Sequence, residues 1–222
     1  MWRRNRVARS HEKDSDEQPR GSTRERILEA AMEVFAQKGY HGAIVDDIVR
    51  ASDTSKGSFY FHFPNKQGIF LALVDQLSRL LAQQVESAIA GRHGGVNKVD
   101  AALCTVLQTF AEHRKLAKLL LVEAVGLGQA FDRKLLEVHG RFAQIIKGHL
   151  DGAVEDGDIP PIDTEIASYV WLGAISEVVI RWLYTGQPDP LEQALPALRI
   201  LLLRSIGVPQ SRYLDGTIEH QS

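Results

Sequence analysis

The chain has one cysteine, Cys104, among its 222 residues. A single cysteine cannot form an intrachain disulfide, a CxxC redox pair or a cysteine-based zinc site. No apolar run is long enough to span a bilayer, and charged residues follow the basic N-terminus in place of the apolar segment of a secretory signal. These absences predict a soluble cytoplasmic protein with no membrane partner.

Motifs of the common enzyme and metalloprotein classes are also absent. The sequence contains no HExxH, no Glu-x-x-His pair, no GxSxG and no GxxxxGK[ST]. Glu112-His113 and Glu219-His220 are adjacent in sequence, so their side chains point in different directions on a helix. We therefore expect no enzyme activity, no catalytic residue, no metal site and no cofactor.

Neither sign of charge dominates, because 26 Lys and Arg stand against 28 Asp and Glu. Residues 1–70 carry a small positive excess and residues 71–222 a small negative one. DNA binding needs positive charge only on the contacting face, so this balance is compatible with DNA binding without arguing for it. The hydrophobic content of 44% excludes disorder throughout and suffices for a small domain plus a larger one.

Helical periodicity runs through the chain, and alternating segments typical of strands are lacking. Ser22 and Glu25 match a capping box, which predicts a first helix that ends near Lys38-Gly39. The fold class predicted is all-α. The other expected helices are Val45–Ala51, Ser55–His62, Asn65–Ala90, Val96–Glu112, Lys115–Gly126, Phe131–Glu155, Thr164–Tyr184 and Leu191–Ile206.

Residues 39–70 are the most informative stretch. Two short helices joined by the polar turn Ser52-Asp53-Thr54 have the spacing of a helix-turn-helix that enters DNA. Phe59 and Phe63 are four residues apart and share the inward face of the second helix. The outward positions are then Lys56, Ser58, Tyr60 and His62.

From Thr23 to Phe70 the chain resembles the TetR family of tetracycline-repressor-like transcriptional regulators. The segments Ile48-Val49-Arg50, Ser55–Phe63 and Pro64-Asn65-Lys66 are similar to the family's second helix, recognition helix and following corner. The resemblance implies a homodimer on an inverted-repeat operator of double-stranded DNA, most simply a repressor that a small-molecule effector releases. The apolar faces of the larger domain favour a small lipophilic effector, with an acyl chain or acyl-thioester and an aromatic compound as open alternatives. The DNA-binding residues it implies are Arg50, Ser55, Lys56, Gly57, Ser58, Tyr60, His62 and Lys66.

The matched positions suggest a division of roles. Ser58 and Tyr60 are the candidates for contacts with bases, whereas Lys56, His62 and Lys66 are candidates for contacts with phosphate. For each residue taken singly, an ordinary surface charge, a core ring or a helix cap is an open alternative. Their order on one short helix is what favours DNA binding.

Two positions depart from the family pattern. Ala43-Ile44 replaces the usual hydroxyl residues before the second helix, which removes a side-chain N-cap. Asp53 stands where a glycine is usual, and we expect it to adopt the left-handed conformation that Asp tolerates better than most residues. Its negative charge near DNA predicts a modest operator affinity.

The chain divides into a disordered arm (1–21), the helix-turn-helix domain (22–68), an effector-binding and dimerisation domain (69–208) and a tail (209–222). Residues 71–222 match the family only in architecture, so the effector's identity does not transfer. Whether the arm contacts DNA or is a mobile tail stays open. Its candidate contacts are Arg3, Arg4, Arg6 and Arg9.

Polar and aromatic side chains on the apolar faces of the larger domain are candidates to orient an effector, with an ordinary ion pair or packing contact as the alternative for each. They are Glu123, His139, Phe142, Tyr169, Trp171, Glu177 and Arg181. The last two helices are apolar nearly all round, which predicts a dimer interface or, alternatively, burial within one monomer. The predicted interface residues are Leu172, Ile175, Val179, Trp182, Leu195, Leu198 and Leu202.

Two other functional classes stay open at this point. A helical protein-interaction module that kept the helix-turn-helix would bind DNA with little dependence on salt. A helical-bundle enzyme without a recognisable motif is the second alternative.

Overall fold

The computed structural model describes residues 22–124 and 127–211, which contain nine α-helices, two short turns of other helix types and no strand. The all-α fold class is therefore confirmed. The predicted arm and residues 212–222 of the tail lie outside the described residues. The helices are α1 (Thr23–Gly42), α2 (Val45–Ala51), α3 (Lys56–His62), α4 (Lys66–Ile89), α5 (Gly95–Glu112), α6 (Arg114–Lys118), α7 (Gln129–Glu155), α8 (Thr164–Thr185) and α9 (Leu195–Ser205).

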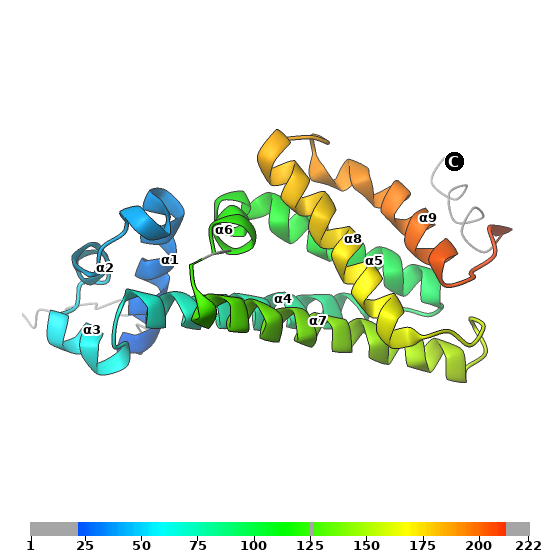
Figure 1. The fold of residues 1–222 in the computed structure, drawn as a ribbon, viewed down its shortest axis with the longest axis horizontal. Coiled ribbons are helices and arrows are strands. Elements are labelled where there is room, and N and C mark those ends of the chain that lie inside the picture. The colour runs from blue at the N-terminus through cyan, green and yellow to red at the C-terminus, as the bar shows by residue number, and fades with distance from the viewer. Residues whose placement is uncertain (1–21, 125–126, 212–222) are drawn as a thin grey trace, which may run out of the picture.

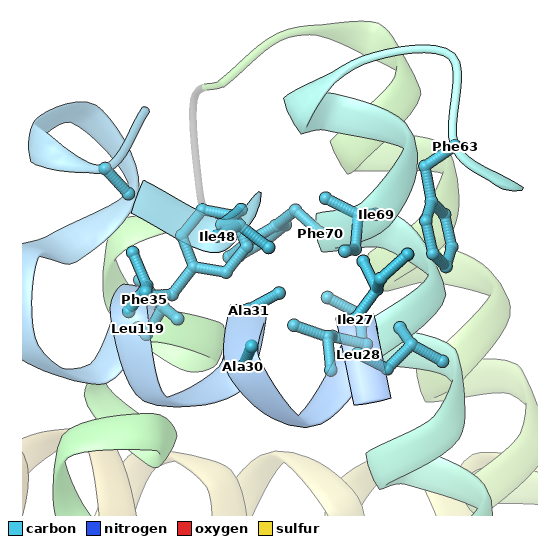
Figure 2. Packing of buried hydrophobic residues seen from close by; sticks show 14 of the residues in the cluster. Ile27, Leu28, Ala30, Ala31, Phe35, Ile48, Phe63, Ile69, Phe70 and Leu119 are labelled. Carbon is cyan, nitrogen blue, oxygen red and sulfur yellow. The ribbon is translucent and has the colours of Figure 1, made fainter. Parts of the chain in front are cut away.

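Helices α1–α3 form a small unit, the reading head, at one end of the molecule (Figure 1). Its core is a cluster of buried aromatic and aliphatic side chains that includes Phe59. Figure 2 shows Phe35 and Phe70 of the same cluster. Phe59 and Phe63 of α3 both lie in this cluster, as their spacing predicts. Because Phe70 comes from α4, the first turns of that helix belong to the packing of the reading head.

Helix α1 begins at the capping box that the sequence predicts. The Ser22 hydroxyl accepts from the Glu25 backbone N–H at 3.3 Å, and the Glu25 carboxylate accepts from the Ser22 N–H at 2.8 Å. The helix continues to Gly42, past the predicted end, but Gly39 breaks its geometry with φ 70°. Only glycine reaches this region without strain, so the predicted stop is present as a kink.

At the two positions that depart from the family pattern, Ala43-Ile44 and Asp53, the structure has the expected backbone and capping. No side chain caps α2 at Ile44, and only the Asp47 carboxylate accepts the Ile44 N–H, at 3.3 Å. Asp53 has φ 50°, in the left-handed region. The turn therefore forms with Asp in a conformation that glycine would adopt at lower cost.

Two predicted helices are interrupted. The segment expected as one helix over Lys115–Gly126 is α6 followed by a π-helical turn, η1 (Leu119–Glu123), in which the Ala124 N–H donates to the Leu119 carbonyl. A 3-10 turn, η2 (Leu191–Ala194), precedes α9. Pro196 has no N–H to donate four residues back, so an α-helix cannot pass continuously through this point.

The larger part of the molecule is a bundle around a second apolar core. Helices α4 and α7 run side by side along its length, α5 packs on α4, α8 on α7, and α9 on α5 and α8 (Figure 1). Helix α8 has 22 residues and contains an 18-residue window with a mean hydropathy of 1.3, so by length and composition alone it could cross a bilayer. This corrects the expectation that no such segment exists, although Trp171, Val179 and Trp182 of α8 lie in the bundle core.

Candidate nucleic-acid interface and effector cavity

Helix α3, the predicted recognition helix, is a short helix with one buried and one exposed face. The Ser55 hydroxyl accepts the Ser58 N–H at 3.0 Å and caps the helix, while Phe59 anchors the inner face. The Tyr60 side chain is 54% exposed, and the Phe61 side chain is 84% exposed. Large aromatic side chains this exposed on a seven-residue helix are available to a partner surface.

Lys56 lies at the start of α3, where its ammonium group is 2.8 Å from the Asp46 carboxylate of α2. The hydrogen bond to Asp46 and its negative charge raise the pKa of Lys56 above the ordinary lysine value. Both side chains are open to solvent, which screens the pair. The lysine can therefore exchange this carboxylate for a phosphate with little loss.

Lys66 is the first residue of α4, and its side chain reaches back to the end of α1. Its ammonium donates to the carbonyls of Tyr40 at 2.7 Å and Ala43 at 2.9 Å, and it lies 4.5 Å from the centre of the Tyr40 ring. The sequence predicts a phosphate contact, but the structure shows a clamp between the end of α1 and the start of α4. The charge is held by backbone carbonyls that the end of α1 leaves unpaired.

The remaining predicted DNA-binding residues surround α3. Arg50 is exposed at the end of α2, and Gly57 is exposed in the first turn of α3. His62 is half-buried, with its ring 5.0 Å from that of Phe61 and 6.4 Å from that of Phe63. These positions leave Arg50 and Gly57 more accessible than His62.

Sequence reasoning missed three residues of this region. Phe61 and Ile44 are among its most exposed side chains, and no periodicity marks either as functional. Arg26 of α1 donates to the backbone carbonyls of Ser52 at 2.7 Å and Asp53 at 2.9 Å, and so holds the turn before α3. A contact across 26 residues leaves no local signal in the sequence.

A cavity of about 910 Å³ lies in the bundle and is lined by residues of α4, α5, α6, η1, α7, α8 and α9. Its wall is mainly aliphatic and aromatic. The structure brings three of the predicted effector residues, His139, Phe142 and Trp171, to this wall. A volume of this size falls within the range that is usual for small-molecule sites.

The other four predicted effector residues do not line the cavity. Glu123 lies at the junction with the reading head, with Oε2 3.1 Å from where a Cβ of Gly39 would stand. Tyr169 is exposed and donates to Glu165 of its own helix at 2.9 Å. Glu177 and Arg181 are exposed on the outer face of α8.

The predicted interface residues do not form an exposed surface. Val179, Trp182, Leu198 and Leu202 are buried within the single chain and cannot reach a second copy. Leu172 and Ile175 line the cavity, and Leu195 is half-buried against the bundle core. The exposed outer face of α8 and α9 instead consists of Ile166, Val170, Gly173, Glu177, Arg181 and Tyr184 with Ala197 and Leu201.

Within the described ranges, no group of three or more His, Cys, Asp or Glu side chains is placed to hold a metal ion.

Comparison with known proteins gives a consistent result. Residues 27–73 match the family described as bacterial regulatory proteins, tetR family. The fatty acid metabolism regulator protein of Bacillus subtilis (strain 168) is 24% identical over 181 residues, which are 81% of this chain and 93% of the relative.

Solved structures show the same fold. The fatty acid degradation regulator FadR from Bacillus halodurans superposes with a TM-score of 0.76 and 23% identity over 86% of this chain and all of that one. FadR from Bacillus subtilis in complex with stearoyl-CoA superposes with a TM-score of 0.74 and 23% identity, over 84% of this chain and 99% of that one.

Proposed function

Because the chain is a TetR-family helix-turn-helix transcriptional regulator, we propose that it is a repressor that binds an inverted-repeat operator as a homodimer in the cytoplasm and is released by a lipophilic effector. The family consists of DNA-binding regulators and not of enzymes. The observation that carries the DNA-binding part is α3, which is anchored by buried Phe59 and projects Tyr60 and Phe61 into solvent.

The exposed face of α3 supports specific roles. Ser58 and Tyr60 contact base edges, and Phe61 packs on thymine methyl groups in the major groove. Lys56 exchanges Asp46 for a phosphate, while Arg50 and His62 contact the backbone on either side. Gly57 and the capped turn at Ser55 allow close approach of the protein backbone to the duplex.

The outer face of α8 and α9 is proposed as the dimer interface. It exposes Val170, Tyr184 and Leu201 beside the opposite charges of Glu177 and Arg181. A two-fold axis across α8 would bring Glu177 of one copy to Arg181 of the other, because isologous interfaces are self-complementary. The apolar face that makes α8 resemble a membrane span is then covered by the partner.

A long-chain acyl-CoA is the first candidate effector. The cavity is large and mainly apolar, and a relative with the same fold was crystallised with stearoyl-CoA. Release follows if the ligand favours a dimer whose α3 helices no longer match the groove repeat of about 34 Å. Stearoyl-CoA titrated into a labelled protein–operator complex should lower its fluorescence anisotropy. Tight binding without any change in operator affinity would contradict this part of the proposal.

Selection of bound fragments from genomic DNA tests the DNA-binding part. We expect an inverted repeat with half-sites one or one and a half helical turns apart. The affinity should fall steeply with salt, because phosphate contacts release counterions. A shallow salt dependence would instead favour the protein-interaction module.

A further inference from the structure

The effector cavity has two chemically different ends. Along α4 it extends from Val74 to Ile89, a distance of roughly 22 Å at the helical rise of 1.5 Å per residue. All of its charged lining residues come from the α4–α5 turn, the start of α5, the end of α7 with the turn after it, and α9. They are Arg92, Lys98, Asp100, Asp156, Asp158 and Arg199.

These charged residues mark the end of the cavity away from the reading head. The α4–α5 and α7–α8 turns lie at the end of the bundle opposite α1–α3 (Figure 1). Arg199 of α9 belongs to the same end, because its guanidinium is 3.0 Å from the Asp100 carboxylate near the start of α5. An amphipathic ligand therefore places its charged group here and its alkyl chain toward the reading head, since no Lys, Arg, Asp or Glu lines the other end, where the polar side chains are ones such as Ser78, His113 and His139.

The apolar end of the cavity is also the back of the reading-head core. Five residues line the cavity and at the same time belong to that core or pack against it. We call them the shared wall. They are Val74 and Leu77 of α4, Leu116 of α6, Leu120 of η1 and Val138 of α7.

The π-helical turn η1 connects the cavity and the reading head most directly. Leu120 faces the cavity, whereas Leu119 is 2% exposed and lies in the cluster with Phe35 of α1 (Figure 2). Three residues on, Glu123 lies against Gly39 at the kink of α1. Displacement of Leu120 by a ligand must therefore be accommodated by a segment that touches α1 at two points, because close-packed cores transmit small shifts.

We propose that an effector changes the reading head only when its alkyl end fills the cavity at the shared wall, so that ligand binding and operator release are separable by chain length. The inference rests on the proposed effector function. A shorter chain occupies the same cavity from the charged end and stops before Leu120. It binds, but it leaves η1 and α1 in place.

A series of acyl-CoA thioesters from octanoyl to stearoyl tests this on the full-length protein, with binding measured by calorimetry and release by operator anisotropy at ligand saturation. The binding affinity should rise by up to about fourfold for each added methylene, because burying one methylene contributes about 0.8 kcal/mol. Saturating release should be absent for the shortest chains that bind and should appear abruptly at a threshold length. Equal release by every chain that binds would overturn the inference while leaving the effector proposal intact. If no thioester binds, both fail.

Leu120→Ala and Ile175→Ala form a matched pair. Both remove aliphatic side chains from the cavity wall, but Ile175 packs against the bundle core and not against the reading-head core. Both variants should bind stearoyl-CoA more weakly than the parent, within about tenfold, because each loses part of the cavity wall. At ligand saturation, however, Ile175→Ala should still release the operator, whereas Leu120→Ala should keep at least half of its operator bound.

Leu120→Met, which restores bulk at the wall, should recover release and separates this effect from a folding defect. Equal release from Leu120→Ala and Ile175→Ala would overturn the inference.

Discussion

Replacing Lys66 with methionine removes the ammonium group and keeps most of the aliphatic stem. In the structure this ammonium donates to the Tyr40 and Ala43 carbonyls at 2.7 and 2.9 Å and lies over the Tyr40 ring. A hydrogen bond to a charged group contributes about 1.5–3 kcal/mol and a cation–π contact about 0.5–2 kcal/mol. Because the site is only partly buried, we expect a total loss on the order of 2–4 kcal/mol in the free energy of unfolding.

Urea unfolding at neutral pH measures this loss, and operator titrations at several salt concentrations measure the contribution to DNA binding. A clamp predicts lower stability, weaker operator binding because α1 and α4 are less firmly joined, and an unchanged salt slope. Lys56→Met is the matched control. That lysine is exposed and paired only with Asp46, so its removal should hardly change stability but should lower the salt slope by about 1.

The reverse pattern would refute this reasoning. If Lys66→Met unfolds at the same urea concentration as the parent and lowers the salt slope, Lys66 contacts phosphate, as the sequence predicts.

Three further perturbations give sharp expectations. Asp53→Gly relieves a left-handed conformation and removes a negative charge near DNA, so stability should rise by about 0.5–1 kcal/mol and operator affinity should increase, as unfolding and anisotropy measurements would show. Burial opposes ionisation of Asp75, but the hydrogen bond from Arg141 and the charge of Lys134 outweigh it and lower the pKa. Ionised Asp75 therefore stabilises the fold above the unfolded pKa of about 3.9, and this contribution is lost as the pH falls through the lower pKa of the folded state. Asp75→Asn should lower the free energy of unfolding at neutral pH. In acid unfolding curves the variant should lose less stability below about pH 4 than the parent does. If the outer face of α8 and α9 is the dimer interface, Leu201→Asp on the exposed face of α9 should convert a parent dimer to monomers in sedimentation experiments, and a variant that sediments as the parent does would contradict that interface.

Local signals predicted the reading head well. The capping box at Ser22, the positive φ of Asp53 and the inward pair Phe59 and Phe63 depend on residues a few positions apart, and all are present. The π-helical turn after α6 was not predicted. In this turn Leu119 faces the core of the reading head and Leu120 faces the cavity. The spacing of apolar residues in the sequence does not indicate that two neighbouring leucines face different sites.

Helix α8 shows most clearly what the sequence could not predict. Its sequence is apolar on nearly every side, so periodicity does not indicate which face is buried. The structure turns Val179 and Trp182 into the bundle core, Ile175 to the cavity, and Glu177 and Arg181 outward, whereas the sequence predicted the first three at an interface and the last two at the effector. That choice depends on packing against α7 and α9, which are distant in sequence.

The sequence by itself determined the class of the fold, the position of the helix-turn-helix and the inward pair Phe59 and Phe63 of α3, because caps, turns and helical spacing act over a few residues. Only the tertiary structure decided that the Lys66 ammonium joins the end of α1 to the start of α4. It also decided which side of α8 faces inward and that one wall of the cavity packs against the core of the reading head. Each of these depends on side chains brought together from separate helices, and the energy of such contacts is set by burial and distance in three dimensions and not by spacing along the chain.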